Sequence, residues 1–213
     1  MRNIKIVLLL ILPLIADAQL PKKIRPIFML DTYYSSVGGR GADVFGLKGG
    51  VELEGKWRFA AGYNRITADV VEYKRLTPDR AQQAGREEVK AQLYMRYFPL
   101  MAEYVVYSKD PWQFSVPLQL GYGRSYFQYF DAEGNKQRIL ERGVLVNDLG
   151  VTGQYKVLKW FGAGLGLGYR IMLIDNPNID TDFNTPVVSI RLKFFFNEIY
   201  KSLKGLDSPP SGH

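Results

Sequence analysis

Residues 45–64 read FGLKGGVELEGKWRFAAGYN and alternate between apolar and polar positions on both sides of a short break. One face of the first half carries Phe45, Leu47, Gly49, Val51 and Leu53, and the opposite face carries Lys48, Glu52 and Glu54. A period of two is typical of a β-strand, and Gly55 with Lys56 supplies a turn. Residues 45–64 therefore predict an antiparallel hairpin with one apolar face.

The same alternation recurs along the rest of the chain. It covers residues 27–35, 88–97, 114–123, 148–156, 161–171 and 188–196. With the two strands of the hairpin this gives eight segments of about 9–11 residues, the length that a tilted strand needs to cross a bilayer. The sequence predicts an all-β fold: a single antiparallel up-and-down transmembrane β-barrel of about eight strands, with a soluble lipocalin-like barrel as the alternative.

The connections between these strands alternate between long and short. Long polar segments occur at residues 37–43, 68–87, 131–142 and 175–186, and short ones lie around Gly55 and Leu158. Outer-membrane barrels have short periplasmic turns and longer outer loops, so we expect both termini in the periplasm. Residues 99–111 fit neither kind of connection, and we interpret them as a strand extension or a small periplasmic excursion.

The ends of the chain predict export and a separate tail. Arg2 and Lys5 precede an apolar run at residues 6–15, and Ala16-Asp17-Ala18 follows, which is the pattern of a cleaved Sec signal peptide. We therefore expect a signal peptide at residues 1–18, a barrel at 19–196 and a C-terminal periplasmic extension at 197–213. Cysteine is absent, so no disulfide stabilises the chain.

Aromatic side chains fall near both ends of the expected strands, where amphipathic rings favour the interfaces between lipid and water. Those expected at the periplasmic interface are Trp57, Trp112, Trp160, Tyr97, Tyr155, Phe194 and Phe196. Tyr34, Phe45, Tyr63, Tyr122 and Tyr169 are expected at the outer one. This two-level sorting favours the membrane barrel over a soluble one.

The eight alternating strands and the final strand ending in Phe196 resemble the small outer-membrane barrels of the OmpA and OmpX type. The tail at residues 194–200, FFFNEIY, is similar in style to uncharacterised barrel proteins of Bacteroidetes. The resemblance covers nearly all of the mature chain and implies a place in the outer membrane of a Gram-negative bacterium. It carries no diagnostic catalytic motif.

Charged side chains recur on the polar face of the strands. The predicted lumen charges are Glu52, Arg58, Glu88, Lys90, Arg96, Asp148, Lys156, Arg170, Arg191 and Lys193. An eight-stranded barrel is just wide enough for side chains to fill, so such charges need partners. A packed ion-pair network is one interpretation. A narrow anion-favouring path is the other, because seven of the ten are positive.

No pattern in the sequence predicts catalysis, a cofactor or a metal site. The one histidine, His213, is the last residue, and a serine nucleophile needs a base at its side. Glycines at every second position of residues 162–168 lack the G-x-G-x-x-G spacing of a nucleotide loop. The Asx-rich run at 175–182 suits either a turn or calcium. Basic residues of the loop at 68–87 suit either solvent or lipopolysaccharide phosphates.

These features favour a non-enzymatic structural or interaction component, such as an accessory subunit of an envelope complex. The alternatives are a narrow pore for small solutes and a lipid-modifying enzyme. The expected partners are outer-membrane lipid and lipopolysaccharide, with other outer-membrane or periplasmic proteins as further candidates and no nucleic acid. In the tail, a short helical pattern places Ile199, Tyr200, Leu203 and Leu206 on one face, where they could contact a partner, although a tail without a role is the alternative.

Overall fold

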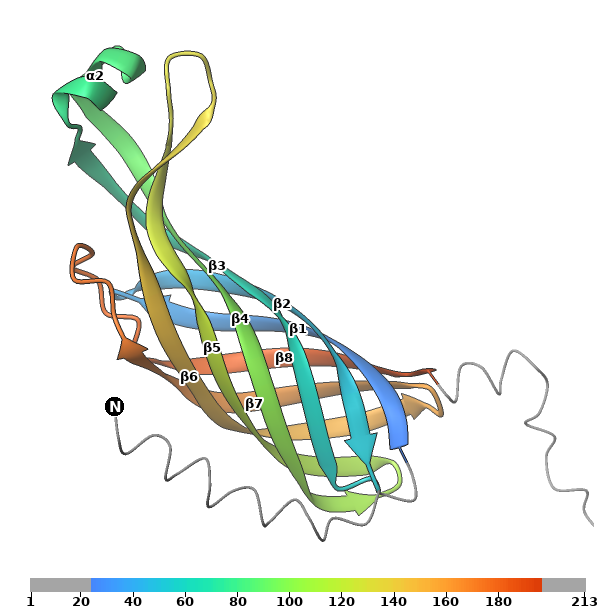
Figure 1. Cartoon of the computed structure of the whole chain (residues 1–213). Helices are drawn as coiled ribbons and strands as arrows, with labels where there is room; N and C mark the ends of the chain where they lie inside the picture. The colour runs from blue at the N-terminus through green and yellow to red at the C-terminus, as the bar shows by residue number, and fades with distance from the viewer. Residues whose placement is uncertain (1–23, 197–213) are drawn as a thin grey trace, which may run out of the picture.

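The computed structural model describes residues 24–196, in which eight antiparallel strands form one closed barrel (Figure 1). The strands are β1 (Ile24–Val37), β2 (Arg40–Leu53), β3 (Trp57–Arg75), β4 (Glu88–Lys109), β5 (Trp112–Phe130), β6 (Lys136–Leu158), β7 (Phe161–Ile174) and β8 (Thr185–Phe195). Each strand pairs with its neighbours in sequence, and β8 closes the ring against β1 from Ile27↔Phe195 to Ser35↔Val187. The predicted all-β barrel is confirmed.

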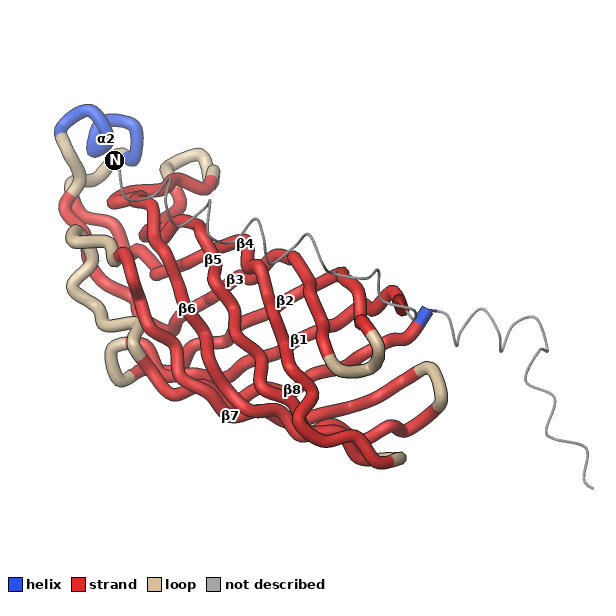
Figure 2. The backbone as a smooth tube through the Cα atoms, turned by 60° about the horizontal axis from the view of Figure 1, so that its bottom comes forward, coloured by secondary structure: helices blue, strands red, loops and turns tan. Residues whose placement is uncertain are grey.

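The two ends of the barrel differ in the connections between their strands, as Figure 2 also shows. Residues 54–56, 110–111 and 159–160 make short turns at one end, here called the turn end. At the opposite loop end, Gly38 and Gly39 join β1 to β2 with φ of +57° and +74°, a positive-φ pair that suits a two-residue hairpin. No helix among residues 24–196 has the length and apolar character needed to cross a membrane.

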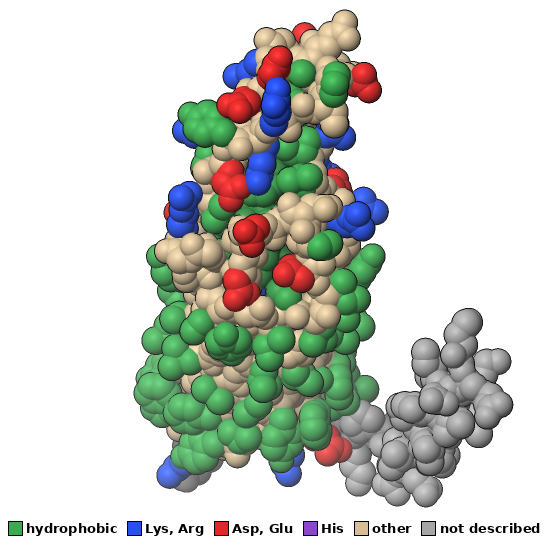
Figure 3. Space-filling model, turned by 90° about the vertical axis from the view of Figure 1, so that its left-hand side faces the viewer, with side chains coloured by type: hydrophobic (Ala, Val, Ile, Leu, Met, Phe, Trp, Pro, Cys, Tyr) green, Lys and Arg blue, Asp and Glu red, His purple; other side chains and the backbone are tan. Residues whose placement is uncertain are grey.

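Exposed apolar side chains from all eight strands form a belt around the half of the barrel nearer the turn end, and Figure 3 shows one side of it. Leu100, Leu165 and Leu167 are each more than 60% exposed, although such side chains are normally buried in water-soluble proteins. The inner face of the same strands carries polar and charged groups. This inside-out distribution is typical of a barrel whose outer surface faces lipid.

Strands β3 to β6 continue past the belt at the loop end, beyond β1, β2, β7 and β8 (Figure 1). This projection is called the flange and is taken with its base as residues 65–97 and 123–143; residues 65–68 at the base still pair with β2. Its β3–β4 connection contains the short helix α2 (Pro78–Ala84). Much of the predicted loops at 68–87 and 131–142 is therefore strand, and the predicted loop at 37–43 is a two-residue turn.

The chemistry of the two strand faces exchanges where β4 leaves the flange. Leu93, Met95 and Tyr97 face inward and are almost fully buried, whereas Phe98 and Leu100 face outward and are 66% and 68% exposed. The inner face is apolar within the flange, whereas within the belt it carries the buried charges beside a small apolar cluster that includes Met29 and Met101. Residues 99–111 are thus the belt-crossing part of β4 and its turn, which resolves the stretch that fitted no predicted connection.

Three predicted lumen charges are wrong because of this exchange. Glu88, Lys90 and Arg96 lie on the outer face of the flange, while Val89, Ala91 and Leu93 occupy the inner face. The sequence interpretation assumed that apolar residues face lipid, which holds in the belt. In the flange the surroundings are water, so the apolar face packs inward.

Candidate functional site

The lumen of the belt is filled by ion pairs that connect neighbouring strands. Arg58 on β3 lies directly between Glu52 on β2 and Glu103 on β4 in the strand register. Its Nε donates to Glu52 Oε2 at 2.7 Å, and its Nη atoms donate to Glu103 and Gln113. Lys193 Nζ on β8 donates to Glu52 at 3.1 Å. Arg58 on β3 thereby contacts side chains of β2, β4 and β5 directly, and it is linked to β8 through the Glu52 carboxylate.

Arg191 links this layer to a second one. Its Nη1 donates to Glu103 Oε2 at 2.5 Å, and its Nε donates to Asp31 Oδ1 at 2.7 Å. Lys48 also pairs with Asp31 and donates to the Tyr33 hydroxyl at 3.0 Å. The Tyr33 hydroxyl donates to Asp31 at 2.9 Å and accepts from Gln119 at 3.0 Å. The network therefore crosses the lumen from β8 to β5.

A third group lies between β4, β6 and β7. Arg170 Nε donates to Asp148 Oδ1 at 2.8 Å, and its Nη2 donates to the Tyr97 hydroxyl at 3.1 Å. That hydroxyl donates to Asp148 Oδ2 at 2.8 Å. With this group, all eight strands contribute a side chain to the lumen networks.

Apolar packing closes the lumen on the loop-end side. The β7–β8 connection inserts Ile179 and Phe183 into the apolar core of the flange, where they are 4% and 1% exposed. Asn176 Nδ2 fixes this connection by donating to Leu140 O at 2.8 Å and Ser125 Oγ at 3.0 Å. The segment predicted as a turn or calcium loop thus acts as a plug.

One small cavity lies between these layers. A cavity of about 20 Å³ lies among Tyr33, Asp148 and Arg191, a size that holds one water molecule. Each of the nine buried charges among residues 24–196 has an oppositely charged partner. Pairing matters because burying an ion without a partner costs on the order of several kcal/mol of folding free energy.

Six predicted lumen residues lie in these networks: Glu52, Arg58, Asp148, Arg170, Arg191 and Lys193. Lys156 does not, because it is exposed at the rim of the turn end and pairs with Asp110 at 3.2 Å. Sequence reasoning missed Asp31, Lys48 and Glu103. Lys48 could have been found, since it shares the polar face of residues 45–54 with Glu52.

Most of the predicted interface aromatics lie on the outer surface at the turn end. Trp57, Trp112, Tyr155 and Phe196 are 44–50% exposed, and Trp160 and Phe194 are partly exposed. Ring pairs link adjacent strands, with centroids 4.7 Å apart for Trp57–Tyr104 and 5.0 Å for Trp112–Tyr155. Tyr97 was assigned to the wrong face: it is 1% exposed and belongs to the lumen.

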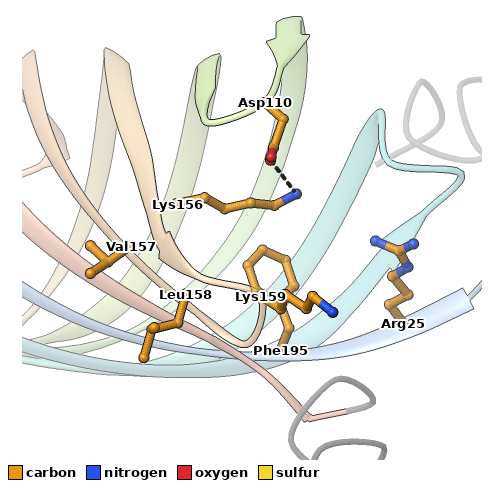
Figure 4. Close-up of a pocket in the computed structure, with 7 residues that line it drawn as sticks. All are labelled: Arg25, Asp110, Lys156, Val157, Leu158, Lys159 and Phe195. Carbon is orange, nitrogen blue, oxygen red and sulfur yellow. Dashed lines mark hydrogen bonds and ion pairs between the residues drawn. The ribbon is translucent and has the colours of Figure 1, made fainter. Parts of the chain in front are cut away.

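A charged vestibule of about 360 Å³ opens at the turn end (Figure 4). Arg25, Lys156 and Lys159 line it together with Asp110 and the Phe195 ring. Figure 4 shows the Lys156 ammonium directed at Asp110 across the vestibule.

The residues expected to contact a partner, Ile199, Tyr200, Leu203 and Leu206, lie outside the described residues, as do the predicted signal peptide and His213. Within residues 24–196 no three acidic, histidine or cysteine side chains gather as a metal site would require.

Replacing Tyr97 with Phe should lower the free energy of unfolding by about 1–3 kcal/mol, because Asp148 and Arg170 each lose a buried hydrogen bond. Tyr104→Phe, on the lipid-facing side of the same strand, should stay within about 0.5 kcal/mol. Denaturant-driven unfolding from lipid vesicles measures both. Equal, small effects would place Tyr97 outside the lumen network.

No protein-family model and no curated protein matches the sequence. Among solved structures, neisserial surface protein A is similar with a TM-score of 0.56 and 12% identity, over 81% of this chain and 99% of that one. A major outer membrane protein from Thermus thermophilus is similar with a TM-score of 0.52 and 13% identity, over 80% of this chain and 99% of that one. The chain has the fold of the small eight-stranded outer-membrane β-barrels.

Proposed function

We propose that this protein is a non-enzymatic, non-conducting outer-membrane barrel that holds the flange outside the cell as a binding surface for other envelope components. The observation that carries the proposal is the filling of the lumen by paired charges and by apolar side chains. In the proposed orientation the short turns at 54–56, 110–111 and 159–160 face the periplasm, as turns of this length do in outer-membrane barrels.

The flange is built as a packed unit, which supports a role for its surface. Leu76, Val89 and Phe127 belong to one buried apolar cluster that continues from the flange into the barrel. Arg80 Nη1 donates to Arg138 O at 2.7 Å, and Arg86 Nη2 donates to Phe130 O at 2.9 Å. The connection containing α2 is thereby fixed to the β5–β6 hairpin.

This arrangement exceeds what membrane insertion requires. Ordering each residue of an extension costs about 1–2 kcal/mol of backbone entropy, which packing must offset. A two-residue turn such as Gly38-Gly39 would connect β3 to β4 with a smaller loss of backbone entropy. We infer that the flange is retained for the surface that it presents.

The alternative of a narrow pore for small solutes requires a continuous polar path. The paired charges fill the lumen within the belt, and the apolar cluster with Phe183 fills it above. The alternative of a lipid-modifying enzyme requires an activated nucleophile, and no observation among the described residues favours it.

The purified protein should show no stable conductance in planar bilayers, because the lumen groups are packed against one another. The double variant Arg58→Ala/Arg191→Ala removes the two guanidinium groups that cross the lumen, and it should conduct intermittently. Steady ohmic current through the unmodified barrel would overturn the proposal and establish the pore.

The orientation is tested by single cysteines, since the chain contains none of its own. Glu133→Cys in the β5–β6 hairpin should react with a membrane-impermeant maleimide on intact cells, whereas Lys56→Cys in a short turn should react only after lysis. Labelling of Lys56→Cys alone on intact cells would show the reverse orientation.

A further inference from the structure

Three arginines lie side by side on the outer face of the barrel, where the flange leaves the belt. The strand register pairs Arg65 on β3 with Arg96 on β4, and Arg96 with Arg124 on β5. Like charges directly opposite each other on adjacent strands are destabilising. We call these three residues the arginine row.

An aromatic row lies two residues nearer the turn end in each of the same strands. It consists of Tyr63, Phe98 and Tyr122, with Phe98 paired with Tyr122 in the register and ring centroids of Tyr63 and Phe98 5.4 Å apart. Two residues of a strand span about 7 Å. Because aromatic rings mark the level where lipid tails meet headgroups, the arginine row lies at the level of the headgroups.

Tyrosine rings hold the guanidinium groups in place. Tyr94 and Tyr126 are stacked with centroids 6.0 Å apart. Arg65 lies 5.4 Å from the Tyr94 centroid, and Arg96 and Arg138 lie 5.6 and 4.6 Å from that of Tyr126. Guanidinium groups that are already positioned on rings lose less entropy when they bind a ligand.

The positive charge of this surface is only partly neutralised. Glu141 contacts Arg124 at 3.1 Å, Arg96 at 3.7 Å and Arg138 at 3.9 Å. Arg65 forms no ion pair with any residue of the described chain. Three guanidinium groups thus share one contacting carboxylate, and the guanidinium of Arg65 contacts no carboxylate of the described residues.

We propose that the arginine row binds the phosphate groups of lipopolysaccharide in the outer leaflet. Guanidinium groups match phosphate oxygens through paired, charge-assisted hydrogen bonds, and a bound phosphate removes the repulsion between neighbouring arginines. The lipid-facing belt lies next to the arginine row on its turn-end side, where it would contact the acyl chains of the same lipopolysaccharide molecule. The inference rests on the proposed orientation, with the loop end outside.

The basic residues of the predicted loop at 68–87 are engaged elsewhere. Arg80 and Arg86 donate to backbone carbonyls, and Lys74 lies over the Phe127 ring, 4.5 Å from its centroid. The arginine row is therefore a separate surface from the loop that the sequence suggested for lipopolysaccharide contact.

The test is titration of the full-length protein in neutral detergent with diphosphoryl lipid A, with adducts counted by native mass spectrometry. Arg65→Gln/Arg96→Gln/Arg124→Gln should weaken binding about tenfold or more, because charge-assisted contacts are lost. The matched control Arg75→Gln/Lys90→Gln/Lys136→Gln removes the same charge farther from the belt and should change affinity by less than about twofold.

Glu141→Gln removes the competing carboxylate and should strengthen binding, so the proposal stays testable even if the triple variant fails to fold. Unchanged binding of both the triple variant and Glu141→Gln would overturn it. Inorganic phosphate that binds the protein as tightly as lipid A would also overturn it, because a free anion would then account for the surface. Cysteine labelling and conductance do not depend on the arginine row, so failure of the proposed function would appear separately.

Discussion

The guanidinium of Arg58 lies between two carboxylates, Glu52 and Glu103, contributed by the strands on either side. This arrangement follows from the size of the barrel, because eight strands enclose a space that side chains fill completely. A charge in that space has no water to solvate it and must be neutralised by a neighbour. Arg191 meets the same constraint by bridging Asp31 and Glu103. The groups that fill the lumen are the same groups that pair neighbouring strands.

The outer surface follows from a second constraint. The same barrel is surrounded by lipid at the belt and by water at the flange. Within the belt the outer face is apolar and the inner face carries the buried charges, whereas in the flange the inner face is apolar and the outer face carries charges. On the outer face of β4 the change occurs between Arg96, which is charged, and Phe98, which is apolar and 66% exposed. The arginine row lies at this boundary, where outward residues first meet headgroups instead of lipid tails. The proposed lipid contact is thus a consequence of where the exchange occurs.

Much of the fold could be predicted from the sequence. The hairpin at residues 45–64, the number of strands and six of the lumen charges follow from a period of two. Glu88, Lys90 and Arg96 were assigned to the wrong face because alternation identifies the two faces of a strand but leaves open which face points inward. In lipid the apolar face points outward, and in water it points inward. Glu103 was missed because residues 99–111 were interpreted as either a strand extension or a periplasmic excursion, and neither interpretation places them across the membrane. The arginine row depends on a register between strands some thirty residues apart, which no local pattern specifies.

The central claim is that buried charge pairs couple the strands across a sealed lumen. A double-mutant cycle on Glu103 and Arg191, with unfolding from lipid vesicles as the measurement, tests it most directly. Each alanine variant should cost about 3–5 kcal/mol because it leaves a buried charge without one of its partners. The double variant should cost less than the sum by about 1–3 kcal/mol. Additivity within about 0.5 kcal/mol would show that the pair does not couple and would contradict the account.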